Sequence, residues 1–214
     1  MTPARALGLG LLLTATAGFI DAVGFIALGG YYTSFMSGNT TQLGTGLATG
    51  MGWALVLPAG LVTLFFIGSY LGSLFAQSSR RSGSAMTLGL VVVGIAISLA
   101  LHLAGYGPAQ SMLALAAAAG AQNAVLQPIG AARIGTTFVT GTLFAAGQDL
   151  ARATIGAAPR WRWLQHLLVW ASLCGGALVG GLAYGQLQMN SLAVPAAIYL
   201  GSLGWFLLRA RAKN

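Results

Sequence analysis

Charged residues are scarce in this sequence, and acidic residues are almost absent. Only 6% of the 214 residues are charged, with 10 Lys and Arg together and 2 Asp and Glu together. Soluble domains average about 25% charged residues, so these few charges cannot cover the surface of a soluble fold of this size. Hydrophobic residues make up 57% of the chain, and several apolar runs reach the roughly 20 residues that cross a bilayer. The sequence therefore predicts an all-α membrane protein that crosses the membrane several times.

The same scarcity limits the chemistry that the chain can perform. Its one cysteine, Cys174, cannot form a disulfide within the chain. The two acids, Asp21 and Asp149, and the two histidines, His102 and His166, are scattered along the sequence. We therefore expect no enzyme activity, no metal site and no cofactor. The net charge of +8 comes from basic residues at segment ends. We therefore expect these residues to set the orientation in the membrane, and we expect no nucleic-acid partner.

The apolar segments of the chain have two different lengths. Two of them, 38–50 and 140–151, have only about thirteen residues, or about 20 Å of helix against a hydrocarbon core of about 30 Å. If both are re-entrant half helices, all 10 basic residues fall on one face of the membrane, whereas two further crossings would separate Arg80 and Arg81 from the rest. The positive-inside rule therefore favours six transmembrane helices plus two half helices, with both chain ends in the cytoplasm. The six predicted transmembrane segments are 6–28, 52–76, 84–104, 109–129, 163–184 and 192–208.

An internal repeat relates the two halves of the chain. The stretch AGFIDAV from Ala17 parallels AGAQNAV from Ala119, which aligns Asp21 with Asn123. Further on, TSFMSGNT parallels TTFVTGTL, which aligns Ser34 with Thr137. With three crossings in each half, the second copy enters from the opposite face. We therefore expect a single transmembrane domain, residues 1–214, built as a 3+3 inverted repeat of about 5–105 and 108–209. The alternative is chance similarity between helices rich in small residues.

A polar, glycine-containing break precedes each half helix. Ser37 and Asn39, like Thr140 and Thr142, are residues that favour helix N-caps, and Gly38 permits a turn. Two half-helix N-termini meeting near the midplane would bind a small neutral or anionic solute. The alternative is that the hydroxyl groups only cap the helices and hold them together. The predicted solute-binding residues are Asp21, Thr33, Ser34, Ser37, Gly38, Asn39, Thr40, Gln122, Asn123, Thr136, Thr137, Thr140, Gly141 and Thr142.

Asp21 is the most informative single residue. It lies about sixteen residues into a spanning helix, where an ionisable group is costly and indicates a functional site. Asp21 is therefore the candidate for proton coupling, while Asn123 keeps the shape of the side chain without its charge. The alternative is a carboxylate that pins the facing half helix. Asp149, in contrast, is expected to form a surface ion pair with Arg152.

Two motifs together carry a family resemblance. The pattern GFIDAVGF from Gly18, followed by TSFMSGNTTQLG from Thr33, resembles the YoaK-like family of bacterial inner-membrane proteins, a domain of unknown function. The resemblance extends over essentially the full chain. It implies a multipass protein of the bacterial inner membrane and assigns no substrate.

These patterns together favour a secondary transporter of a small solute, coupled to protons through Asp21, in which one repeat rocks against the other. The alternatives are a channel with the same facing half helices, or a lipid-handling or scaffolding membrane protein. The expected partners are membrane lipid and the solute. A homodimer is a further expectation, because the glycine pairs Gly68-xxx-Gly72 and Gly176-xxx-Gly180 indicate close helix packing either within the chain or between two copies.

Overall fold

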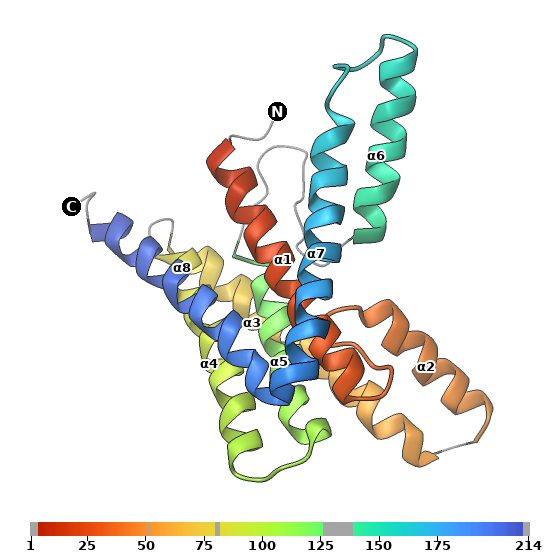
Figure 1. Cartoon of the computed structure of the whole chain (residues 1–214), viewed down its shortest axis with the longest axis vertical. Coiled ribbons are helices and arrows are strands. Elements are labelled where there is room, and N and C mark those ends of the chain that lie inside the picture. Colours follow the sequence, from red (N-terminus) through yellow and green to blue (C-terminus); the bar gives the residue numbers. More distant parts are fainter. Residues whose placement is uncertain (1–3, 51, 80–81, 126–138, 212–214) are drawn as a thin grey trace.

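The chain folds into helices that meet in a central bundle (Figure 1). The computed structural model describes residues 4–50, 52–79, 82–125 and 139–211, and within these ranges every regular element is a helix, which confirms the all-helical fold. The α-helices are α1 (Ala4–Ala27), α2 (Met36–Ala48), α3 (Val56–Ser78), α4 (Gly83–Leu103), α5 (Pro108–Gln122), α6 (Val139–Thr154), α7 (Trp163–Leu187) and α8 (Ala193–Arg211), with short 3-10 helices η1 (Gly52–Leu55) and η2 (Gln188–Leu192).

Four stretches of the described residues are long and apolar enough to cross a membrane. They are Leu7–Ala27, Val56–Ser78, Gly83–Leu103 and Trp163–Leu208, the last of which contains α7 and most of α8. Helix α5 is shorter than the predicted segment 109–129, because it ends after 15 residues at the polar pair Gln122 and Asn123. This length corresponds to about 22 Å of helix, less than the thickness of a hydrocarbon core. The last part of the predicted segment, from residue 126, lies outside the described residues.

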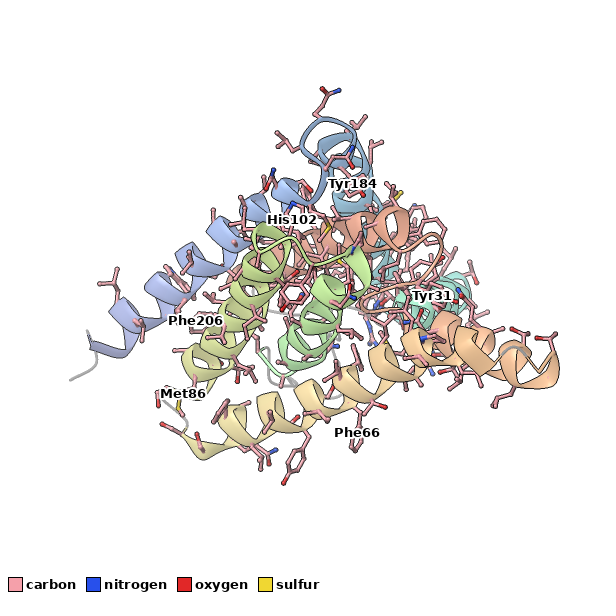
Figure 2. The ribbon with its side chains drawn as sticks, turned by 90° about the horizontal axis from the view of Figure 1, so that it is seen from below. Tyr31, Phe66, Met86, His102, Tyr184 and Phe206 are labelled. Carbon is pink, nitrogen blue, oxygen red and sulfur yellow. The ribbon has the colours of Figure 1, made fainter. Side chains whose placement is uncertain are left out.

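Large apolar side chains face outward from several of these helices. Phe66 on α3 is 71% exposed and is directed away from the bundle (Figure 2). Leu182 on α7 and Leu208 on α8 are similarly exposed. A surface of this kind suits a hydrocarbon solvent, and it agrees with the membrane-embedded protein expected from the composition.

Glycines bring α1 against α7 and α3 against α5. A Cβ atom at Gly176 would lie 1.9 Å from the carbonyl oxygen of Ala15, and one at Gly68 would lie 1.9 Å from the carbonyl oxygen of Ala117. Both distances are too short for any side chain, so backbone packs directly on backbone. The glycine pairs identified in the sequence therefore serve packing inside the chain.

The same contacts occur in both halves of the chain. Ala15 and Ala117 are 102 residues apart, which is the offset of the first sequence repeat, and Gly68 and Gly176 are 108 residues apart. A third position follows the pattern, because a Cβ atom at Gly18 would meet the Leu173 carbonyl oxygen just as one at Gly120, 102 residues later, would meet that of Phe65. The first long helix of each half thus packs on the second long helix of the other half.

One pair of helix contacts differs between the halves. Helices α4 and α5 pack closely, with Gly94 against Ala118 and the carbonyl oxygen of Ala114, and they leave a cavity of about 130 Å³ between α3, α4 and α5. The corresponding helices α8 and α1 touch at few positions, and an open groove of about 770 Å³ lies between them. One of these two interfaces is therefore closed and the other is open.

Adjacent glycines on α7 test the packing. Gly176→Ala should lower the free energy of unfolding by about 1–3 kcal/mol, because the new methyl group must separate α7 from α1. Gly175→Ala should leave stability unchanged or slightly raised, since its Cβ atom would have nothing within 4 Å and alanine favours a helix. Thermal unfolding of the two purified variants in one detergent measures the difference, and equal melting temperatures would contradict the packing described.

Candidate functional site

The chain turns back into the protein directly after α1. Gly29 and Gly30 have φ angles of +65° and +112°, a backbone region that glycine adopts at little cost. The return brings residues 31–35, here called the tip, alongside α1 at the level of Asp21. Asp21 lies six residues before the end of α1, or about 9 Å along the helix axis. The tip therefore returns to membrane depth before α2 begins.

The Asp21 carboxylate is surrounded by donors from the tip. Its Oδ1 atom accepts hydrogen bonds from the amide of Thr33 at 3.0 Å, the Thr33 hydroxyl at 2.7 Å and the amide of Ser34 at 2.7 Å. Its Oδ2 atom accepts a further hydrogen bond from the Ser34 hydroxyl. All three residues are buried. A buried carboxylate requires this many donors, since each one replaces a hydrogen bond to water.

The expected N-caps of α2 are not formed. The helix begins at Met36 after Phe35, no side chain caps it, and Ser37 and Asn39 lie within its first turns. The amide of Met36 donates to the Ser34 carbonyl at 3.0 Å, and that of Gly38 donates to the Phe35 carbonyl at 3.1 Å. The prediction was wrong because the first amides of α2 donate to backbone carbonyls of the tip and not to a side chain. The anion nearest the beginning of α2 is the protein's own Asp21, which accepts from the tip itself.

Asn39 fixes the tip from the other side. It is buried, and its side chain accepts from the Tyr32 amide at 3.0 Å and donates to the Tyr32 carbonyl at 2.7 Å. Gly38 provides space for the Tyr32 ring, which would lie 3.1 Å from a Cβ atom at that position. Gly38 is helical and forms no turn, contrary to the sequence-based expectation. Asp21 and Asn39 together hold the tip through side chains from α1 and α2.

The remaining hydroxyl groups of α2 face outward. Ser37 and Thr40 are exposed, and the Thr40 hydroxyl donates to the Met36 carbonyl at 2.7 Å. Thr41 and Thr45 bond to the backbone of their own helix in the same way. Hydroxyl groups satisfied within their helix can face lipid or protein without an open hydrogen bond.

Gln122 belongs to a second buried polar cluster, which joins three helices. Its side-chain amide donates to the carbonyl of Leu13 on α1 at 2.9 Å, and the hydroxyl of Tyr199 on α8 donates to its Oε1 atom. The sequence analysis did not identify Tyr199. The available signal was a tyrosine in the interior of an apolar helix, where its hydroxyl group needs a partner.

The second half of the predicted site is described only in part. Asn123 follows the last residue of α5, and its side-chain amide donates to the Ala119 carbonyl at 3.3 Å. Thr140 and Gly141 are exposed in the first turn of α6, and Thr142 is half-buried. Thr136 and Thr137 lie outside the described residues. The structure therefore brings together Asp21, Thr33, Ser34 and Asn39, and it leaves Thr140 and Gly141 at a separate surface.

Asp149 forms the expected contact with Arg152, but it is buried and has closer partners near the beginning of α7. Asp149 is buried, and its carboxylate lies 2.8 Å from Nε of Arg162 and 3.3 Å from Nε2 of His166, both from the beginning of α7 or just before it. Arg152 is 4.0 Å away. The pair with Arg152 is therefore present, but the expected surface position is wrong, because Asp149 is buried and faces α7. Sequence spacing predicted the neighbour on the same helix, whereas the closer contacts come from the packing of α6 on α7.

Two substitutions at Asp21 test how the tip is held. Asp21→Leu should lower the free energy of unfolding by at least about 2 kcal/mol, because two amides and two hydroxyls lose their acceptor in a buried place. Asp21→Asn should cost much less, since the asparagine oxygen can still accept at Oδ1 while its amide donates to the Ser34 hydroxyl. Denaturant unfolding of both variants checks this order. Equal losses would show that the hydrogen bonds of Oδ1 contribute little.

Comparison with known proteins gives a consistent family assignment. A family described as "Protein of unknown function (DUF1275)" matches residues 9–205. The "UPF0700 transmembrane protein RA0705" of Rhizobium meliloti is 30% identical over 212 residues, covering 97% of this chain and 88% of that protein. The "UPF0700 transmembrane protein YoaK" of Bacillus subtilis is 26% identical over 202 residues, covering 89% of each. No solved structure matches.

Proposed function

Since the chain belongs to the DUF1275 family and is similar to transmembrane proteins, we propose that it is a secondary transporter of a small solute, coupled to protons through Asp21. The observation that carries this proposal is the set of four donors from Thr33 and Ser34 around the Asp21 carboxylate. The sequence analysis left neutral and anionic solutes open, and these donors favour an anion.

Asp21 acts in this proposal as a tethered anion that competes with the solute. While Asp21 is charged, it occupies the amide and hydroxyl donors that an anionic solute would need. When Asp21 is protonated, it no longer competes as an anion, and the donors of the tip become available. Binding of the solute would then be linked to uptake of one proton. An ionisable group at membrane depth is well suited to this task.

The proposed architecture is the 3+3 inverted repeat with six crossings, in one transmembrane domain. The sequence repeat supports it, and so do the two matched sets of contacts at Gly68 and Gly176. Helices α2 and α6 also run outward from the middle of the molecule in different directions, one toward the bottom right of the view and one toward its top (Figure 1). Opposed half helices of this kind are typical of many transporters.

We further propose that the protein lies in the bacterial inner membrane with both chain ends in the cytoplasm. The beginning of α1 and the turn between α6 and α7 lie toward the top of the view, whereas the turn between α4 and α5 lies at the bottom (Figure 1). Arg5, Arg160 and Arg162 belong to the first group of segments. This arrangement supports one basic face, as the positive-inside rule requires of the cytoplasmic side.

The closed α4–α5 interface and the open α1–α8 interface support alternating access. In an inverted repeat, two corresponding interfaces can exchange their shapes, so that the open one closes while the closed one opens. The present structure would then be one of two related states. The alternative function, a channel, does not require the two interfaces to exchange their shapes.

Binding of anions at two pH values tests the role of Asp21. We expect a thermal-shift screen of small carboxylates and inorganic anions on the purified protein to find a ligand that binds more tightly at pH 5.5 than at pH 7.5. Linkage to one proton allows a change in affinity of up to about tenfold per pH unit. Asp21→Asn should remove the pH dependence, because asparagine carries no competing charge.

Asp149→Asn is the matched control, since it makes the same chemical change at the other acid of the chain. This variant should keep the pH dependence even if its melting temperature falls. A wild-type response that is unchanged in Asp21→Asn would exclude coupling through Asp21. If no anion binds at either pH, the tip has only the structural role of holding α2.

Cross-linking of two corresponding pairs tests alternating access. In a Cys174→Ala background, Leu90→Cys with Ala114→Cys probes the closed interface, and Leu12→Cys with Ile198→Cys probes the open groove. We expect acidic pH to change the two cross-linking yields in opposite directions, because one interface opens as the other closes. A groove pair that never cross-links under any condition would favour a fixed structure.

A further inference from the structure

The groove between α1 and α8 has the properties of a binding site for a bilayer lipid. Its volume of about 770 Å³ falls within the range of about 300–1,000 Å³ that is usual for small-molecule sites. Gly8, Leu9 and Leu12 of α1 and Ala197, Ile198, Gly201, Ser202 and Trp205 of α8 line it. We propose that it holds an acyl chain of an anionic phospholipid from the surrounding membrane. This lipid would be a second ligand, distinct from the transported solute.

The side chains that line the groove are mostly apolar and suit a hydrocarbon occupant. Ser202 is its one hydroxyl-bearing side chain, and that hydroxyl donates to the Ile198 carbonyl of its own helix at 2.8 Å. The other lining positions offer glycine, aliphatic or aromatic surface. From Ala197 to Trp205 the groove follows eight residues of helix, or about 12 Å. A polar solute would find no open partner among these side chains, whereas a lipid chain needs none.

The position of the groove in the membrane favours an anionic headgroup. Trp205 lies in the last turns of α8, where tryptophan is typical of the membrane interface. On α1 the position one turn before Gly8 and Leu9 is Arg5, and on α8 the position one turn after Trp205 is Arg209. The two helical faces that form the groove therefore continue to basic positions at one end. Basic residues beside an apolar crevice are a recurring way to bind anionic lipid.

Comparison with the other half of the protein indicates that an acyl chain can occupy the α1–α8 interface. Helices α4 and α5 correspond to α8 and α1, and they close on each other through Gly94 and Ala118. At the α1–α8 interface, a Cβ atom at Gly8 or at Gly201 would have nothing within 4 Å. The space that these glycines leave open is thus a property of one half only. An acyl chain between α1 and α8 would hold this interface apart.

Native mass spectrometry tests the proposal with two phospholipids of identical acyl chains, phosphatidylglycerol and phosphatidylcholine. We expect one phosphatidylglycerol to remain on each wild-type chain in preference to phosphatidylcholine. Gly201→Leu should reduce this retention about tenfold, because its side chain fills the groove. Gly204→Leu is the matched control on the same helix, since Gly204 is equally free of neighbours but does not line the groove. It should retain lipid as the wild type does.

Gly8→Leu blocks the groove from the α1 side and provides a second variant if Gly201→Leu does not fold. Arg209→Gln should lower the preference for phosphatidylglycerol without abolishing retention. Equal retention by Gly201→Leu, Gly8→Leu and Gly204→Leu would overturn the proposed site. Equal retention of the two lipids would overturn its anionic character, and a second copy of the chain in place of lipid would overturn the proposed occupant. None of these outcomes depends on transport, so the proposed function is tested separately.

Discussion

The hydrogen bonding of one buried carboxylate determines how the first half of this protein is built. Asp21 accepts four hydrogen bonds from Thr33 and Ser34, and these bonds hold the tip at the depth of α1. Neither partner could stay there alone, because both a buried carboxylate and unpaired backbone amides are costly away from water. The direction of α2 follows from this contact, since the helix starts directly after the tip. A change in the charge of Asp21 would therefore act on a whole segment of the chain.

Backbone contact at glycines gives the bundle a second constraint. Gly68 and Gly176 allow α3 and α7 to lie directly on α5 and α1, so the long helices of the two halves are interlocked. A contact of this kind leaves little freedom, because two backbones in contact cannot approach further. The interface between α1 and α8 has no such constraint and contains the large groove. Rigid pairs next to an open interface are compatible with the proposed rocking of one repeat against the other.

Helix positions were predictable from the sequence, whereas most partners of polar side chains were not. The segments predicted as half helices, 38–50 and 140–151, correspond to helices α2 and α6, because apolar length and flanking glycines are local signals. Asp21 was identified by its depth in an apolar segment. Its partners Thr33 and Ser34 were named as neighbours, but the sequence could not tell whether they bind a solute or Asp21 itself. Asp149 shows the same limit, since spacing predicted its contact with Arg152 but not the closer one with Arg162 that helix packing provides.

The direct measurement for this account is hydrogen–deuterium exchange at the amides of Thr33 and Ser34. If Asp21 holds the tip, both amides exchange slowly in the wild-type protein, and Asp21→Leu accelerates their exchange by a factor on the order of 100, since each loses a hydrogen bond to a charged acceptor. The amides in the interior of α3 should be accelerated only as far as the global stability falls, and they serve as the internal reference. Rapid exchange of Thr33 and Ser34 in the wild type, at the rate of an unstructured peptide, would contradict the account.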